Sequence, residues 1–128
     1  MKPTTHSHSK LFVHLVWSTK MRLDLLPAHV REILDNTLAQ TAMKTDCTFM
    51  EWGGTRDHLH LLVRYRPDIS VAELVRRIKS AMSHRIREAG HPEFEWQAGY
   101  GAYSVSEDGL ESVAAYIRAQ WDHHGDGE

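Results

Sequence analysis

The sequence predicts an α+β domain in which an antiparallel sheet packs against helices. Apolar, β-branched runs that are typical of strands alternate with stretches whose apolar residues recur at helical spacing. The 128 residues fit one domain, and 41% hydrophobic with 25% charged residues is ordinary for a globular protein. Internal repeats and low-complexity linkers are absent, so we treat residues 1–128 as a single domain, with residues 1–9 and 125–128 expected to be disordered.

The first half of the sequence predicts a strand, a helix and a second strand. Residues 10–20 form an apolar, β-branched run. Residues 25–45 place Pro27 near a helix start and then repeat apolar residues every three or four positions. Residues 46–54 predict the second strand, and the break at 53–55 predicts a hairpin with the strand that follows.

The second half predicts a strand, a helix, a strand and a final helix. The third strand lies in the stretch 56–66, and Ser70 with Glu73 forms a capping box that opens a helix ending near Gly90. Residues 96–106 predict the fourth strand, and acidic residues after Ser106 open the last helix. This order is that of a ferredoxin-like (RRM-like) βαββαβ sheet with an additional C-terminal helix. We expect helices on one face of the sheet and an open opposite face.

Two histidines stand on one side of the third strand. Side chains alternate across a strand, so His58 and His60 share a face in "RDHLHLLVRYR". Two neutral imidazoles could bind one divalent metal ion, or they could be polar residues on a solvated face. We expect His14, in the first strand, to be a hydrogen-bonded histidine at the edge of the core.

The last predicted helix carries a second set of polar residues. At helical spacing Tyr116, Gln120 and His123 fall together on the shoulder of its apolar stripe. A tyrosine at such a margin is usually a packing residue. Combined with His58 and His60, however, Gln120 would give a metal ion two nitrogens and one oxygen, and Tyr116 would lie beside that ion.

Charge is distributed unevenly, although the net charge is only −2. Residues 64–87 hold seven basic and two acidic residues, a sum of +5, whereas nine acidic residues and Arg118 give −8 over residues 88–128. The basic segment could bind phosphates or could be a solvated helix face. The single cysteine, Cys47, and the absence of an apolar run of membrane-spanning length favour a soluble protein of a reducing cytoplasm.

Several motifs together resemble one enzyme family. "HLHLLV" is similar to the HUH motif (His, bulky hydrophobe, His), and "YIRAQWDHH" is similar to the nucleophile helix of the HUH single-tyrosine transposases. These are enzymes of insertion sequences of the 200/605 type and their relatives at repetitive extragenic palindromes (REP). The resemblance extends over "HLVWSTK", "GGTRDHLHLLV", "AELVRRIKS" and "FEWQAGYGAYSVS". The chain departs from many relatives by its short, acidic end, "HHGDGE".

The resemblance implies a chemistry for these residues. Tyr116 would attack single-stranded DNA to form a 5′-phosphotyrosine, and His58, His60 and Gln120 would bind Mg²⁺ or Mn²⁺. His123 would be an auxiliary residue for proton transfer. The DNA would carry hairpin or palindromic ends, and the bacterial, cytoplasmic enzyme would be a homodimer whose tyrosine helix can complete the partner's site.

The resemblance and the charge pattern also name candidate DNA contacts, each of which could equally be a surface residue that confers solubility. They are Lys20, Arg22, Arg76, Arg77, Lys79 and Arg85. Two other functions remain open. One is a catalytically silent module that binds single-stranded nucleic acid, and the other is a metal-dependent phosphodiesterase in which water replaces the tyrosine.

Overall fold

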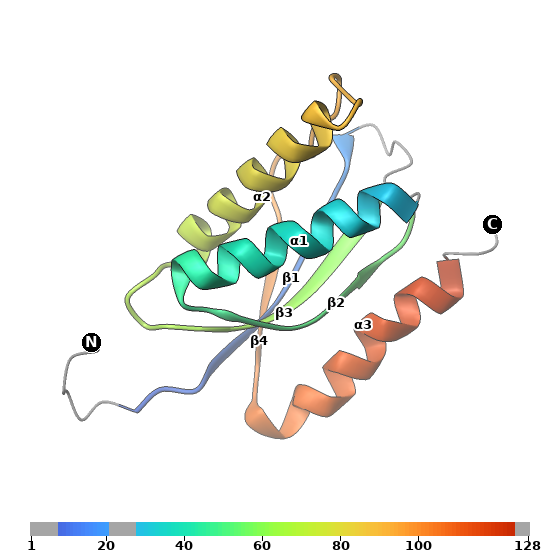
Figure 1. Cartoon of the computed structure of the whole chain (residues 1–128). Helices are drawn as coiled ribbons and strands as arrows, with labels where there is room; N and C mark the ends of the chain where they lie inside the picture. Colours follow the sequence, from blue (N-terminus) through green and yellow to red (C-terminus); the bar gives the residue numbers. More distant parts are fainter. Residues whose placement is uncertain (1–7, 21–27, 125–128) are drawn as a thin grey trace.

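The computed structural model describes residues 8–20 and 28–124, and it has the predicted order of elements (Figure 1). The elements are β1 (Leu11–Ser18), α1 (Ala28–Thr45), β2 (Thr48–Gly54), β3 (His58–Tyr65), α2 (Val71–Glu88), β4 (Gly101–Val105), a 3₁₀ turn (Glu107–Gly109) and α3 (Leu110–His124). The strands form one antiparallel sheet in the order β2-β3-β1-β4. This confirms the ferredoxin-like βαββαβ fold with a C-terminal helix.

Local signals in the sequence account for the ends of α2. The Ser70 side chain accepts a hydrogen bond of 3.0 Å from the main-chain N–H of Glu73, as the capping box predicted. The helix ends at Glu88, and Gly90 follows with a φ of 117°, a conformation that glycine adopts without a steric penalty.

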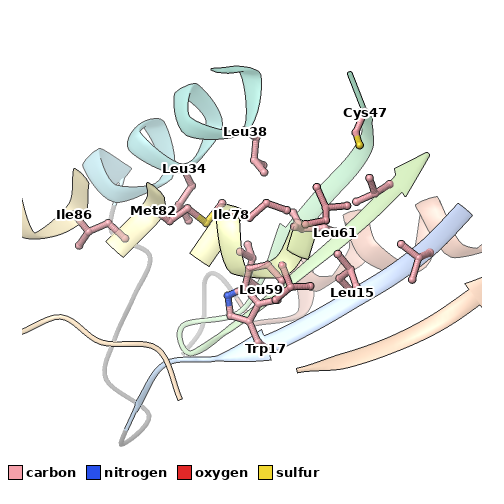
Figure 2. Close-up of a cluster of buried hydrophobic side chains, with 14 of the residues drawn as sticks. Leu15, Trp17, Leu34, Leu38, Cys47, Leu59, Leu61, Ile78, Met82 and Ile86 are labelled. Carbon is pink, nitrogen blue, oxygen red and sulfur yellow. The ribbon is translucent and has the colours of Figure 1, made fainter. Parts of the chain in front are cut away.

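The main core lies between one face of the sheet and the helices α1 and α2. Leu59, Leu61 and Val63 of β3 point into it, as the alternation along that strand predicted. Figure 2 shows Leu59 and Leu61 below the helices, where Leu34 and Ile78 meet the sheet. Cys47 is buried in the same cluster. The face of β3 that carries the histidines therefore points away from this core.

The opposite face of the sheet is only partly open, which corrects our expectation of an open face. Helix α3 contacts β2 and β3 on the side away from α1 and α2 (Figure 1). Ile117 of α3 is fully buried, and Leu62 of β3 is buried outside the main core cluster. Exposed side chains on that face remain along β4, where Tyr103 is 58% exposed.

The fourth strand is shorter than the predicted range of 96–106. Trp96 makes an isolated bridge with Thr19, and pairing with β1 resumes only at Gly101. Between them Gly99 has a φ of 89°, and Lys79 donates to the main-chain carbonyls of Gln97 and Gly99. These carbonyls are satisfied by an ammonium rather than by a neighbouring strand. No helix within the described residues is long and apolar enough to cross a membrane.

Candidate active site

Strand register brings three aromatic side chains together on the face that α3 covers. His60 of β3 lies opposite Val16 of β1, two residues from His14 on the same face. Tyr103 of β4 lies opposite His14. The ring centroids of His14 and His60 are 5.3 Å apart, and the ring of Tyr103 is 6.0 Å from that of His14.

Both HUH histidines have their Nδ1 atom engaged by a neighbouring side chain. Nδ1 of His58 lies 2.6 Å from a carboxylate oxygen of Asp57, and Nδ1 of His60 lies 3.0 Å from Nε2 of His14. Engagement of Nδ1 orients each ring and makes Nε2 the nitrogen with which each would bind a metal ion. The same arrangement, a ligand imidazole hydrogen-bonded through its other nitrogen, is usual at metal sites in proteins.

The tyrosine of α3 lies against this histidine pair. The ring of Tyr116 meets the rings of His60 and His14 edge-on, with centroids at 5.8 and 6.1 Å. Tyr116 is nevertheless 53% exposed, so its phenol is accessible from outside. Ile117 anchors the helix below it, and Arg118 pairs with Glu51 of β2 at 2.8 Å.

Gln120 follows one turn after Tyr116 and is 9% exposed. Its amide nitrogen lies 3.3 Å from the main-chain oxygen of Tyr116, to which it donates. The side-chain oxygen of Gln120 is therefore the atom with which it would ligate a metal ion. The side chain of His123 lies outside the described residues.

The buried imidazoles are neutral at ordinary pH. Burial, together with the nearby His14 and His58, lowers the pKa of His60 to about 4. Burial also lowers the pKa of His14. Neutral imidazoles keep a nitrogen lone pair, which metal binding requires.

These donors fit a divalent ion in type and number. In the described part of the chain no three His, Cys, Asp or Glu side chains are grouped to hold a metal ion, so two imidazoles need a donor of another kind. The amide oxygen of Gln120 is such a donor. Two nitrogens with one oxygen suit Mn²⁺ better than Mg²⁺, which prefers oxygen ligands throughout.

Comparison with known proteins identifies the family. Residues 7–120 match the family described as "Transposase IS200 like". The chain belongs to the IS200-like transposases. It is 26% identical over 121 residues to the ISDra2 transposase TnpA of Deinococcus radiodurans, a match that covers 88% of this chain and 86% of that protein.

Two solved structures are similar to this transposase. One is a crystal structure of a Deinococcus radiodurans protein assigned as a transposase, with a TM-score of 0.73, 27% identity, and coverage of 94% of this chain and 98% of that one. The other is a REP-associated tyrosine transposase bound to a REP hairpin, with a TM-score of 0.72 and 16% identity. That match covers 98% of this chain and 75% of the other, and it supports the fold alone.

Three of the candidate DNA contacts of the transposase lie away from Tyr116. Arg76, Arg77 and Arg85 line a groove of about 510 Å³ between α1 and α2, together with Lys44. Helices α1 and α2 cover the core face of the sheet, so this groove and the tyrosine lie on opposite faces (Figure 1).

The candidate cations differ in how they are held within the protein. Arg76 and Arg77 both pair with Glu73 at the surface, and Arg85 donates to the side chain of Gln40. Lys20, which is not part of this groove, pairs with Glu95 at 3.1 Å. The Lys79 ammonium donates to two main-chain carbonyls. Arg22 lies outside the described residues.

Sequence reasoning missed His14, Asp57 and Tyr103 as neighbours of the site. His14 was expected to be a hydrogen-bonded histidine at the core edge, and its hydrogen bond is to His60 itself. Alternation along β1 was the available signal, because it places His14 on the face opposite Val13 and Leu15. Pairing β1 with β3 would then have put His14 on the face of the HUH histidines.

Proposed function

We propose that this IS200-like transposase cleaves and rejoins single-stranded DNA through a covalent bond to Tyr116. The observation that carries the proposal is the position of Tyr116, an exposed phenol whose ring lies 5.8 Å from that of the buried His60. The phenol is accessible to a DNA strand, and the imidazole beneath it is neutral and oriented by His14.

The proposed step exchanges one phosphodiester for another. The phenolic oxygen of Tyr116 forms a bond to phosphorus while the bond from phosphorus to the 3′ oxygen breaks. The phenolic proton finishes on the departing 3′-hydroxyl, and the 5′ phosphate stays on the tyrosine. Because a phenolate is a good leaving group, a 3′-hydroxyl can reverse the step and rejoin strands without nucleotide energy or water.

His58, His60 and Gln120 are the proposed metal ligands, for Mn²⁺ or Mg²⁺. Such an ion, when bound, would polarise the phosphate and neutralise charge that builds up during the exchange. Asp57 and His14 hold the two imidazoles in place. Gln120 is held through its amide nitrogen by the turn of helix that also carries Tyr116. One helix therefore supplies both the nucleophile and the oxygen ligand.

The DNA substrate is proposed to carry a hairpin. The structurally similar REP-associated transposase is bound to a REP hairpin, and this chain has a basic groove lined by Lys44, Arg76, Arg77 and Arg85. Arginine and lysine side chains can bind phosphates of either a duplex stem or a single strand. Since the groove and Tyr116 lie on opposite faces, the groove would hold the stem while a single-stranded flank reaches the tyrosine.

The test is formation of a covalent adduct with DNA. The protein is incubated with hairpin-bearing single-stranded DNA and Mn²⁺ and then run on a denaturing gel. We expect an adduct in the wild type and none in Tyr116→Phe. Tyr103→Phe is the matched control, because Tyr103 is an equally exposed phenol on the same face that contacts His14 from the neighbouring strand. We expect this variant to keep the adduct.

Other outcomes would support the alternative functions. Cleavage without an adduct would favour a phosphodiesterase that uses water, and retention of DNA without cleavage would favour a silent binding module. An adduct that survives Tyr116→Phe and disappears in Tyr103→Phe would assign the nucleophile to β4 and contradict the proposal.

The transposase is further proposed to act as a homodimer whose tyrosine helix can serve the partner's site. In the structure α3 contacts the sheet of its own chain, so a single chain already brings Tyr116 beside His60. Sedimentation of the full chain, alone and with hairpin DNA, measures the oligomeric state directly. A species that stays monomeric under both conditions would contradict a dimer.

A further inference from the structure

We propose that His14 is a positioning residue that holds His60 in its metal-binding tautomer. The inference rests on the proposed function, because it concerns the metal ligand His60. Its basis is the hydrogen bond of 3.0 Å between Nε2 of His14 and Nδ1 of His60, which joins β1 to β3 across 46 positions in the sequence.

The protonation pattern of this hydrogen bond follows from the role of His60. A neutral imidazole has one N–H and one nitrogen lone pair, and a metal ion takes the lone pair. If His60 binds the ion through Nε2, its proton must be on Nδ1. Nδ1 then donates, and Nε2 of His14 must accept. His14 in turn carries its own proton on Nδ1, so both rings have a defined tautomer.

Sheet geometry fixes His14 in this role. Its ring plane makes an angle of 27° with that of His60, and it also contacts the rings of Tyr103 and Tyr116. In the register of β1 and β3, His14 lies opposite Leu62. His60 lies opposite Val16, the next residue of β1 on the same face. A side chain held on three sides keeps its acceptor nitrogen aimed at His60.

The two HUH histidines are thus supported by different acceptors. His58 has the carboxylate of Asp57, its neighbour in the chain, at 2.6 Å. His60 has a neutral imidazole from another strand. Hydrogen-bond partners of metal ligands generally orient the ring and set its tautomer, and their loss typically weakens metal affinity by about 10- to 100-fold. The structure assigns this function to His14 as well as to Asp57.

Mn²⁺ binding to the full chain without DNA tests the inference. Titration calorimetry of the wild type, His60→Ala, His14→Leu and His14→Gln gives four affinities. His14→Leu removes the acceptor, so we expect an affinity lower by about 10- to 100-fold. His14→Gln retains an acceptor oxygen at similar reach and is expected to recover most of that loss. High Mn²⁺ should then restore adduct formation in His14→Leu.

A distant histidine pair provides the matched control. His29 and His91 also share a hydrogen bond between ring nitrogens, at 2.8 Å, and lie at the start of α1 and after α2. His29→Leu removes one half of such a pair without touching the sheet face that carries His60. We expect it to leave Mn²⁺ affinity unchanged.

The wild-type protein supplies a second measurement that does not depend on a variant folding. Ring-nitrogen chemical shifts of ¹⁵N-labelled histidines report the tautomer directly, and we expect His60 to carry its proton on Nδ1 before metal is added. His60 protonated on Nε2, or equal Mn²⁺ affinity in wild type and His14→Leu, would overturn the inference. If His60→Ala alone weakens Mn²⁺ binding, the proposed metal site stands and only the role of His14 falls. If His60→Ala binds Mn²⁺ as tightly as the wild type, the metal site and the role of His14 are both wrong.

Discussion

Truncation of Ile117 to alanine is expected to release α3 from the sheet while the sheet stays folded. Ile117 is fully buried, whereas Val113 and Ala114 of the same helix are only half-buried. The helix contacts β2 and β3 but lies away from α1 and α2 (Figure 1). Ile117 is therefore a central contact of this attachment, and the main core cluster includes no described residue of α3.

The loss of docking free energy in Ile117→Ala follows from the number of carbon atoms removed. Replacing isoleucine by alanine removes three carbons, each worth about 0.8 kcal/mol when buried, which gives roughly 2.4 kcal/mol. A residual cavity would raise the cost to about 3 kcal/mol, within the usual range for such substitutions. The exposed ion pair between Arg118 and Glu51 offers only about 0.2–1 kcal/mol and would not compensate. A loss of about 3 kcal/mol changes the docking equilibrium by on the order of 100-fold.

Hydrogen exchange and adduct formation measure the two consequences. Amides of α3 in Ile117→Ala should exchange faster than in the wild type, while those of β1 and β3 keep their protection. Adduct yield should fall because Tyr116 no longer stays beside His60. Ile86→Ala is the control, since Ile86 is equally buried but belongs to α2 and the main core. It should lower the stability of the whole domain without selectively exposing α3.

One result would refute this reasoning. If α3 of Ile117→Ala exchanges no faster than α3 of the wild type and the adduct yield is unchanged, the docking of α3 does not depend on Ile117. Equal loss of protection in α3 and in β1 would instead show that α3 unfolds only together with the sheet.

Three further predictions concern the titration of His60, DNA binding by Arg76 and the structural role of Lys79. Because the pKa of His60 is about 4 in the folded state and 6.5 is its ordinary value, the unfolded chain takes up a proton first as the pH falls. Folding stability should therefore drop between pH 6.5 and 4 by on the order of 2 kcal/mol, after allowance for solvent screening. Urea unfolding of the wild type and of His60→Gln measures this, because the difference in stability between them should change by that amount over the same pH range. A difference that does not vary with pH would contradict the prediction. Arg76→Ala should weaken hairpin binding and reduce the slope of log affinity against log salt concentration by about one. Lys79→Met should instead lower the folding stability by about 1–2 kcal/mol, because the Lys79 ammonium donates to two main-chain carbonyls. DNA binding measured at several salt concentrations tests Arg76→Ala, and urea unfolding tests Lys79→Met. Loss of stability in Arg76→Ala with loss of DNA binding in Lys79→Met would contradict these roles.

The order of elements could be predicted because its signals are local. The capping box at Ser70 and the alternation through Leu59, Leu61 and Val63 each depend on a few neighbouring residues. The shortening of β4 had no such signal. It coincides with contacts from Lys79 of α2, whose ammonium binds the carbonyls of Gln97 and Gly99.

The candidate site also has features that a local sequence pattern predicts and features that depend on tertiary packing. His58 and His60 are two residues apart, and Tyr116 and Gln120 are one helical turn apart, so spacing alone placed each pair on one face. Their meeting depends on where α3 docks, which an amphipathic stripe does not specify. The partnership of His14 with His60 depends on the register of β1 against β3. Long-range pairing of this kind leaves no local pattern in one sequence.

The docking of α3 on its own sheet bears on the proposed sharing of sites between subunits. A tyrosine helix that completes the partner's site must first leave its own sheet, which exposes Ile117 and breaks the Arg118–Glu51 pair. Sharing therefore requires that a state with α3 released from its own sheet is populated. Mixing Tyr116→Phe with His60→Ala tests this, because only exchange between chains unites an intact tyrosine with an intact His60. Adduct formation in the mixture, absent from either variant alone, would establish sharing; an inactive mixture of proven mixed dimers would confine each tyrosine to its own sheet.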